Sequence, residues 1–444
     1  MKVSRTPSIA SLLIAAAIIT AAPSEAQQLP PVLTLDDALR LAREHSPTYA
    51  QVLNNPDVDE ANLRFARSRF YPTPTLELNT GGGPTRTTIL DSTSFKRESD
   101  ASIAVGLSMP LLDNGSRRNQ LRAAKLGSLR TNIEIEQAGL VLRTTVAQRY
   151  YAAVLAQRSI QLEERTLEKQ RGNLAESRDR FRIGRSSQVD LLNAELAVEA
   201  AANALERARD ASRKRRLELV EAMGISAEIP PTLDSVLPQP VDPDKLDADP
   251  LLAIARAHNP LLRREDVTLD VSGNAARFTR SSRWRPEVRA GVNYRRFLTE
   301  KAYGAFLQPD LPNSVLSFNL TAGYDFPEWF QSSAQVVTAE IALADQQQVI
   351  RGRAITVERQ VRSQLIDFQA AARDLALAER RVQMTREVVS IAEEQLRAGT
   401  IPFFQYQSYV DQAVLAERDV LQARLTLITQ QLLIEETIGA PLGG

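Results

Sequence analysis

The two histidines are the first residues whose types and spacing suggest chemistry. His45 and His258 stand in similar surroundings, Leu41-Ala-Arg-Glu-His-Ser-Pro47 and Ile254-Ala-Arg-Ala-His-Asn-Pro260. Imidazole is a common metal ligand, so a pair of metal-binding histidines is one interpretation. No carboxylate or third ligand is placed with both rings, as a metal site would need. We therefore favour the same packing of a helix end in both places and expect no metal site.

Other catalytic signatures are missing from the sequence. The chain has no cysteine, which excludes disulfides, thiolate metal sites and cysteine nucleophiles. It has no phosphate-binding glycine loop, nucleophile elbow or zinc-protease helix. The run Gly81-Gly-Gly83 lies in a presumed hairpin loop and is not followed by a helix. We therefore predict that the protein is not an enzyme and has no catalytic residue and no cofactor.

The overall charge points to no nucleic-acid partner. Lys and Arg total 54, Asp and Glu total 54, and the formal net charge is zero. One basic run, residues 213–216, lies in a stretch of helix formers. A solvated helix face explains this run better than a targeting patch does.

The first 26 residues predict a secretory signal peptide. Lys2 and Arg5 precede an apolar middle, and the small residues Ser24 and Ala26 are spaced as a cleavage site, so we expect the mature chain to start at Gln27. No cysteine follows to carry a lipid anchor. Later apolar runs fall short of the ~18 residues of a transmembrane helix. The exported chain is then expected to be soluble, surface-bound or part of a closed β-barrel.

The prolines divide the chain into helical zones. No proline occurs at residues 111–229 or 328–401, whereas six lie between residues 230 and 250. Proline is excluded from helix interiors, so each empty zone predicts one very long helix, roughly 116–181 and 332–396. At ~1.5 Å per residue each helix is about 100 Å long, which implies a coiled-coil rod or a tube. Residues 226–250 are the expected linker.

The two halves of the chain resemble each other, which indicates a first repeat at 27–225 and a second at 251–444. The histidine motifs are offset by 213 residues (254 − 41), and Arg182 and Arg397 by 215 (397 − 182). Each half reads as helix, two strands, long helix, turn and shorter helix. The shorter helices are expected at 35–70, with a break near Pro56, and at 187–223.

Four segments alternate apolar and polar residues, as half-buried strands do: 75–80, 101–111, 287–297 and 314–326. The segments between them, 81–98 and 300–313, carry turn formers and charge and are expected to be exposed loops. Four strands cannot close a membrane barrel, since the smallest use ~8. We therefore expect several copies to supply strands to one barrel.

The order of elements resembles the outer membrane efflux protein family, the TolC-like exit ducts. The resemblance covers nearly all of the mature chain, from residues 33–39 to 438–440, and two stretches carry it most, residues 110–118 and 181–195. It implies a mainly α protein with a small β part. The implied assembly is a homotrimer whose twelve-stranded β-barrel sits in outer-membrane lipid above a periplasmic α-helical barrel. The implied function is a passive duct that contacts a periplasmic adaptor and, through it, an inner-membrane transporter of drugs, metals or proteins.

An exported coiled-coil scaffold or adhesin without a pore is the alternative. It explains the helices and the signal peptide, but it does not explain four alternating strands placed symmetrically in two repeats. Extraction with the outer membrane distinguishes the two interpretations.

The resemblance also places a periplasmic gate and the adaptor contact at the two helix turns. Asp190 matches an acidic gate position, although the dipole of a helix's first turn is an equal explanation for an acid there. Gln405 and Ser408 stand where other members have acids, and the aromatic residues of the second turn suggest a more apolar constriction. The predicted tip residues are Gly184, Arg185, Asp190, Gly399, Thr400, Phe403, Phe404, Gln405 and Ser408.

Overall fold

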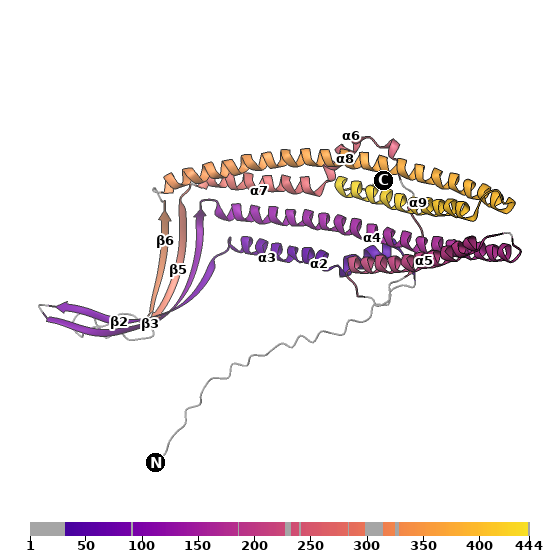
Figure 1. Ribbon diagram of the computed structural model, residues 1–444. Coiled ribbons are helices and arrows are strands. Elements are labelled where there is room, and N and C mark those ends of the chain that lie inside the picture. The colour runs from indigo at the N-terminus through magenta and orange to yellow at the C-terminus, as the bar shows by residue number, and fades with distance from the viewer. Residues whose placement is uncertain are drawn as a thin grey trace, which may run out of the picture.

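The computed structural model describes residues 32–89, 92–184, 186–226, 232–238, 241–282, 284–297, 314–324 and 328–442. The predicted signal peptide lies outside the described residues. The molecule is long and narrow, with strands at one end and two helix turns at the other (Figure 1). None of the described helices holds a stretch long and apolar enough to cross a membrane.

The helices of the first half include one of 67 residues. They are α1 (Leu35–His45), α2 (Pro47–Leu53), α3 (Asn55–Ser68), α4 (Ser116–Arg182) and α5 (Gln188–Met223). The predicted break near Pro56 is confirmed, because α2 ends at Leu53. A second break lies at Ser46, where the helix end expected beside His45 interrupts the predicted range 35–70, and Pro47 in the first turn of α2 explains it.

The second half has the same kinds of helices. They are α6 (Ala248–His258), α7 (Pro260–Ser282), α8 (Glu328–Ala398) and α9 (Phe403–Ile438), and α8 has 71 residues. Both predicted long helices are confirmed to within a few residues. A short parallel pair, β1 (Val32–Leu33) with β4 (Thr232–Leu233), ties the start of the described chain to the linker, where a 3-10 turn spans Pro243–Lys245.

The described residues also contain an antiparallel four-stranded sheet in the order β2-β3-β5-β6. Its strands are β2 (Thr73–Ile89), β3 (Ser92–Asp113), β5 (Glu287–Phe297) and β6 (Ser314–Gly323). The loop predicted at residues 81–98 is wrong, because β2 and β3 stay paired from Thr80–Ala101 to Ile89–Ser92. Threonine and serine are frequent on both arms, and threonine favours extended backbone. The second predicted loop, 300–313, lies outside the described residues.

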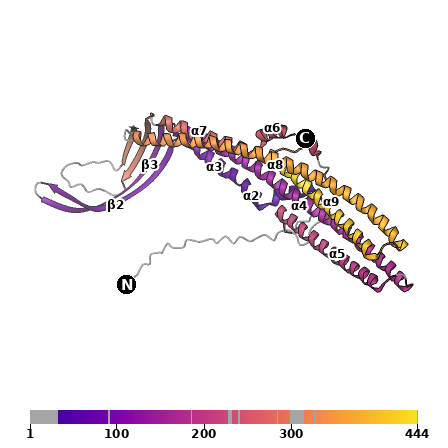
Figure 2. The same ribbon diagram turned by 45° about the horizontal axis from the view of Figure 1, so that its top comes forward.

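The helices other than α1 and α6, which pack against its middle, form a wall one layer thick. α3, α2 and α5 follow one side of α4, α7 and α9 follow its other side, and α8 packs on α7 and α9 (Figures 1 and 2). One edge of the wall is therefore α3 with α5, and the other edge is α8. Apolar clusters join α1, α4 and α5 in the first half and α6, α8 and α9 in the second.

Short helices meet end to end near the middle of the wall, at two junctions. α5 ends at Gly224 and α9 ends at Gly439, with φ of 73° and 74°. A Cβ added to Gly224 would lie 2.5 Å from the carbonyl oxygen of His45, and one added to Gly439 would lie 2.6 Å from that of His258. Both histidines thus lie where one helix end packs against another.

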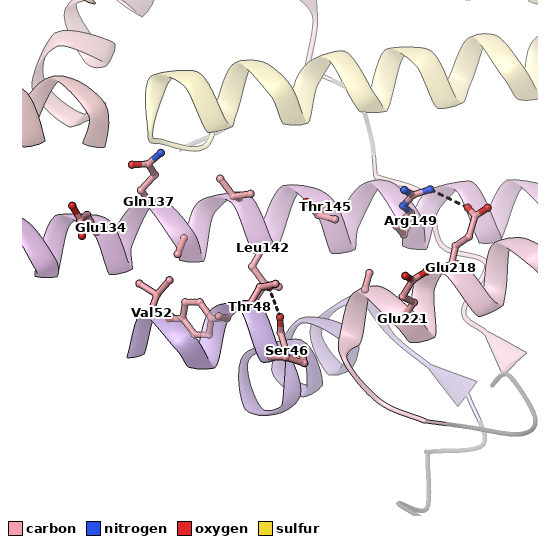
Figure 3. A pocket seen from close by; sticks show the side chains of 15 residues that line it. Ser46, Thr48, Val52, Glu134, Gln137, Leu142, Thr145, Arg149, Glu218 and Glu221 are labelled. Atoms are coloured by element: carbon pink, nitrogen blue, oxygen red, sulfur yellow. Dashed lines mark hydrogen bonds and ion pairs between the residues drawn. The ribbon is translucent and has the colours of Figure 1, made fainter. Parts of the chain in front are cut away.

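A buried tyrosine fixes the linker at the first junction. Tyr150 of α4 is 2% exposed, and its hydroxyl lies 3.1 Å from the carbonyl oxygen of Leu33 and 3.2 Å from that of Asp234. Burial raises the pKa of Tyr150 to about 12. Beside this junction α2, α4 and α5 line a hollow of about 590 Å³, where Arg149 pairs with Glu218 (Figure 3).

Candidate functional site at the helix turns

The predicted site lies at the end of the wall remote from the strands, where α4 turns into α5 and α8 turns into α9 (Figure 1). Gly184 and Gly399 have φ of 73° and 75°, the left-handed conformation that ends a helix. The N–H of Gly399 donates to the carbonyl of Leu396 (3.1 Å), and that of Thr400 to the carbonyl of Gln395 (2.9 Å). The Thr400 hydroxyl donates to the same Gln395 oxygen. These residues therefore build the turn itself.

Asp190 caps the start of α5. Its carboxylate accepts hydrogen bonds from the Ser187 N–H (3.2 Å), the Ser187 hydroxyl (2.7 Å) and the Ser186 hydroxyl (3.4 Å). In return the Asp190 N–H donates to Ser187 Oγ at 3.1 Å, which completes a capping box. No hydrogen bond or ion pair joins Asp190 to the described residues of the second turn. Arg185, also predicted here, lies outside the described residues.

The two phenylalanines of the second turn point to different places. Phe403 is 6% exposed and lies with its ring centroid 6.3 Å from that of Tyr406, in a cluster that includes Ala194 of α5 and Leu396 of α8. Phe404 is 65% exposed. Phe403 therefore packs in the core under the turn and Phe404 is the exposed ring of the two, while the apolar constriction stays a prediction.

Gln405 and Ser408 are engaged within α9. The Gln405 amide donates to the hydroxyl of Tyr409 (3.2 Å), and the Gln412 amide donates to Ser408 Oγ (3.4 Å). Both contacts are with residues four positions later, on the same side of the helix. No hydrogen bond joins either residue to the described part of the first turn, so the structure does not link the predicted polar residues of the two turns directly.

An arginine that the sequence did not indicate joins the two turns instead. Arg180 of α4 donates to the carbonyl of Leu396 at the end of α8 (3.1 Å) and pairs with Glu176 (2.7 Å). An arginine in the last turn of a helix is favoured by the helix dipole alone. Its sequence position therefore carried no signal of this contact.

A buried ion pair further along the wall was also missed. Glu163 of α4 is 2% exposed and accepts two hydrogen bonds from Arg418 of α9, at 2.7 and 2.9 Å. Two-point pairing with a carboxylate is the strong geometry for arginine, and it raises the Arg418 pKa. The partners are 255 residues apart, so local sequence spacing does not reveal them.

The described residues offer no group of three or more acidic or histidine side chains suited to a metal ion. Around the turns three large apolar side chains are exposed, Ile183 (62%), Val189 (65%) and Phe404 (65%), beside exposed charged side chains such as Arg182 and Arg397. Such a surface suits non-covalent contact with another molecule.

Comparisons with known proteins agree with this architecture. CusC, from a structural study of transmembrane channel formation, has a TM-score of 0.75 at 14% identity, covering 91% of this chain and 92% of its own. The outer membrane channel CmeC of Campylobacter jejuni has a TM-score of 0.73 at 14% identity, covering 91% of this chain and 85% of its own. At these identities the likeness is one of fold.

Two comparisons rest on sequence. Protein CyaE of Bordetella pertussis is 27% identical over 251 residues, which is 54% of this chain and about half (51%) of that protein's length. The outer membrane efflux protein family profile matches residues 38–225 and 251–440, most of the chain. Together with the helical wall and its small sheet, this match establishes that the chain belongs to the outer membrane efflux protein family.

Proposed function

We propose that three copies of this chain form an exit duct, with a shared twelve-stranded barrel in the outer membrane and a helical tube in the periplasm. The duct is passive: an inner-membrane transporter supplies the substrate through a periplasmic adaptor. The observation that carries this proposal is that the wall has an unpaired apolar surface along both of its edges.

The α8 edge presents a long apolar stripe. Successive residues of the stripe are three, four, seven, eleven or fourteen positions apart, which are close to whole turns and keep them on one face. The face that packs on α7 and α9 lies opposite, at Val361, Phe368, Leu375 and Val382. The exposed stripe comprises Val337, Ile341, Ile355, Ile366, Leu377, Met384, Val388 and Ile391, each between 43% and 67% exposed.

The α5 edge matches it. Ala194, Ala201, Ser212 and Leu219 are buried on the side that packs on α4. The opposite side exposes Val189 (65%), Leu192 (51%), Leu196 (66%) and Leu217 (45%). A wall with two different apolar edges can associate edge to edge, and such head-to-tail contacts form a ring when the rotation between copies closes.

The sheet supports a lipid-facing barrel in the same ring. One row of side chains crosses all four strands through the register pairs Leu76–Val105, Val105–Tyr294 and Tyr294–Leu316. These side chains are 72%, 53%, 44% and 57% exposed, respectively. β2 and β6 are edge strands within the chain, and pairing β2 of one copy with β6 of the next would satisfy their free backbone groups in lipid.

We infer that the helix turns form the periplasmic tip, with both the adaptor contact and the gate. Support comes from their place at the end remote from the sheet and from the exposed side chains around Phe404. We also infer that the chain is a duplicated unit, since α5 and α9 both have 36 residues and both end against a histidine carbonyl.

Electron microscopy of the detergent-purified mature protein tests the proposal. A threefold particle with a hollow tube about 100 Å long is expected from the helix lengths. The double variant Ile366→Asp, Leu377→Asp places charge on the α8 edge and should lower the temperature at which trimers dissociate. Phe404→Asp is the matched control, because Phe404 is as exposed (65%) as Leu377 (67%) but lies at the tip. A solid rod or a compact particle without threefold symmetry would instead favour the exported scaffold.

A further inference from the structure

A row of ion pairs crosses the wall from one edge to the other. Each pair joins two adjacent helices, and the row as a whole connects α5, α4, α9 and α8. Its middle pair is the buried, two-point contact between Glu163 and Arg418. The three pairs are Arg209–Glu164 (3.4 Å), Arg418–Glu163 (2.7 Å) and Arg381–Asp419 (3.2 Å).

The three pairs lie at one level of the wall. Glu163 and Glu164 are neighbours in the chain, and so are Arg418 and Asp419. Successive residues of a helix differ in height by only ~1.5 Å. The row is therefore a band across the wall, with one end on α5 and the other on α8.

Each end of the row carries one further charge that is left unpaired. Asp210 follows Arg209 on α5, and Arg380 precedes Arg381 on α8. Both side chains belong to exposed residues, and neither makes an ion pair or hydrogen bond with the part of the chain that is described. The two unpaired charges have opposite sign.

Both charges lie on the apolar edges. Asp210 comes fourteen residues after Leu196 and seven before Leu217, which puts it on the outward face of α5. Arg380 comes three residues after Leu377 and four before Met384, next to the stripe of α8. A second pair of opposite charges lies further from the tip, with Lys214 four residues after Asp210 on α5 and Asp374 six residues before Arg380 on α8.

The α8 edge is hollowed at this level. A depression of about 540 Å³ lies between α8 and α9, and Asp374, Leu377, Arg380 and Arg381 are among its lining residues. Leu377 also belongs to the apolar stripe, so the depression and the edge are one continuous surface. Its lining includes side chains of both charge signs and apolar side chains, so it can accept a helix face that carries charges on an apolar surface.

We propose that the α5 edge of a second copy of this chain occupies this depression, with Asp210 paired to Arg380 and Lys214 paired to Asp374. This inference rests on the proposed ring. A closed ring has rotation without rise, so groups of neighbouring copies meet at equal heights. The new contacts join the ends of the rows of three copies into a belt of ion pairs around the tube.

The belt sets the register between copies. Apolar edges alone allow a helix to slide by a turn along its neighbour, since the stripe repeats at intervals of whole turns. Charges of alternating sign reject such slipped arrangements, because like charges then face each other. The two opposite charges on each edge, Asp210 with Lys214 and Arg380 with Asp374, therefore specify one alignment.

Cross-linking tests this register. The natural sequence has no cysteine, so only the introduced cysteines can react. The variant Asp210→Cys, Arg380→Cys is treated in outer membranes with a short bismaleimide. The two positions belong to α5 and α8, which lie on opposite edges of one copy (Figure 1), so a link joins neighbouring copies. The expected result is a covalent trimer. The matched control is Asp210→Cys, Ser363→Cys, whose α8 cysteine replaces an exposed residue ~25 Å away along the helix and should give none.

Charge reversal supplies a second measurement. Asp210→Arg and Arg380→Asp should each lower the temperature at which the trimer dissociates, and the double variant should regain most of the loss. Two outcomes would overturn the belt but not the ring. One is a cross-link in the Asp210→Cys, Ser363→Cys variant. The other is an Asp210→Cys, Arg380→Cys variant that is a trimer by light scattering but does not cross-link. A monomer by light scattering would overturn the ring and the belt together.

Discussion

Four glycines among the described residues end helices, and they do so in two different settings. Gly184 and Gly399 at the tip and Gly224 and Gly439 at the junctions share nearly the same φ, 73° to 75°. A Cβ added at either tip glycine meets no atom within 4 Å, whereas at the junctions it would lie 2.5 or 2.6 Å from a carbonyl oxygen. The same backbone conformation is thus packed at the middle of the wall and left open at its end.

Replacing the junction glycines should have the largest effect on the free energy of unfolding. Gly224→Ala and Gly439→Ala combine left-handed strain with a clash against backbone that cannot move aside. Together these should lower the free energy of unfolding by roughly 2–5 kcal/mol. Circular dichroism during heating measures the loss. Gly352→Ala on α8 is the control, since an added Cβ there has open space and should be neutral or stabilising.

The second effect follows from the tyrosine that holds the linker at the first junction. Burial raises the pKa of Tyr150 from 10.0 to about 12, so the folded protein favours the neutral phenol. The resulting stability is fully present below pH 10 and is lost as pH rises through about 12, amounting to about 2–3 kcal/mol. Unfolding followed from pH 9 to pH 12 should therefore show a steeper decline than in Tyr150→Phe. Equal slopes for the two proteins would contradict this role.

The sequence predicted the helices better than it predicted the β2–β3 ribbon or the packing of the glycines. Proline positions placed the long helices and the break near Pro56 correctly, because proline acts through its own backbone. Residues 81–98, the outer part of the β2–β3 ribbon, were predicted as a loop, because glycine and proline are turn formers unless a partner strand pairs with them. The packing of Gly224 against His45 joins residues far apart in the chain, so no local pattern distinguishes it from Gly184.

The tip shows the same limit. A phenylalanine pair at residues 403 and 404 suggested a constriction, yet helical geometry turns one ring into the core and the other outward. The sequence carries no signal of the contact between Arg180 and the Leu396 carbonyl, because arginine is common in the last turn of a helix with or without such a partner. Sequence therefore located the tip but did not assign its contacts.

Smaller effects are expected at the tip glycines. Gly184→Ala and Gly399→Ala carry the left-handed strain without a clash, which amounts to about 1–2 kcal/mol. Proteolysis at the turns and hydrogen exchange of the flanking helix ends should report it as local fraying. A loss as large as that of Gly224→Ala would show that the tip is packed by a neighbouring copy, and the contrast between the two settings would fail.

The smallest change in stability concerns Asp190, where two roles can be separated. Asp190→Ala removes the charge and the half of the capping box that Asp190 supplies, while the Ser187 N-cap stays, so the loss should be at most about 1 kcal/mol. Asp190→Asn keeps a capping oxygen and removes only the charge. If Asp190 acts in a gate through its charge, both variants should increase closed-state leak in planar bilayers. If it only caps α5, Asp190→Asn should conduct as the natural protein does, whereas Asp190→Ala and the control Ser187→Ala should share a frayed turn. An unchanged leak in Asp190→Asn would therefore remove the carboxylate from the gate and leave the exposed apolar side chains of the turns, such as Phe404, to close it.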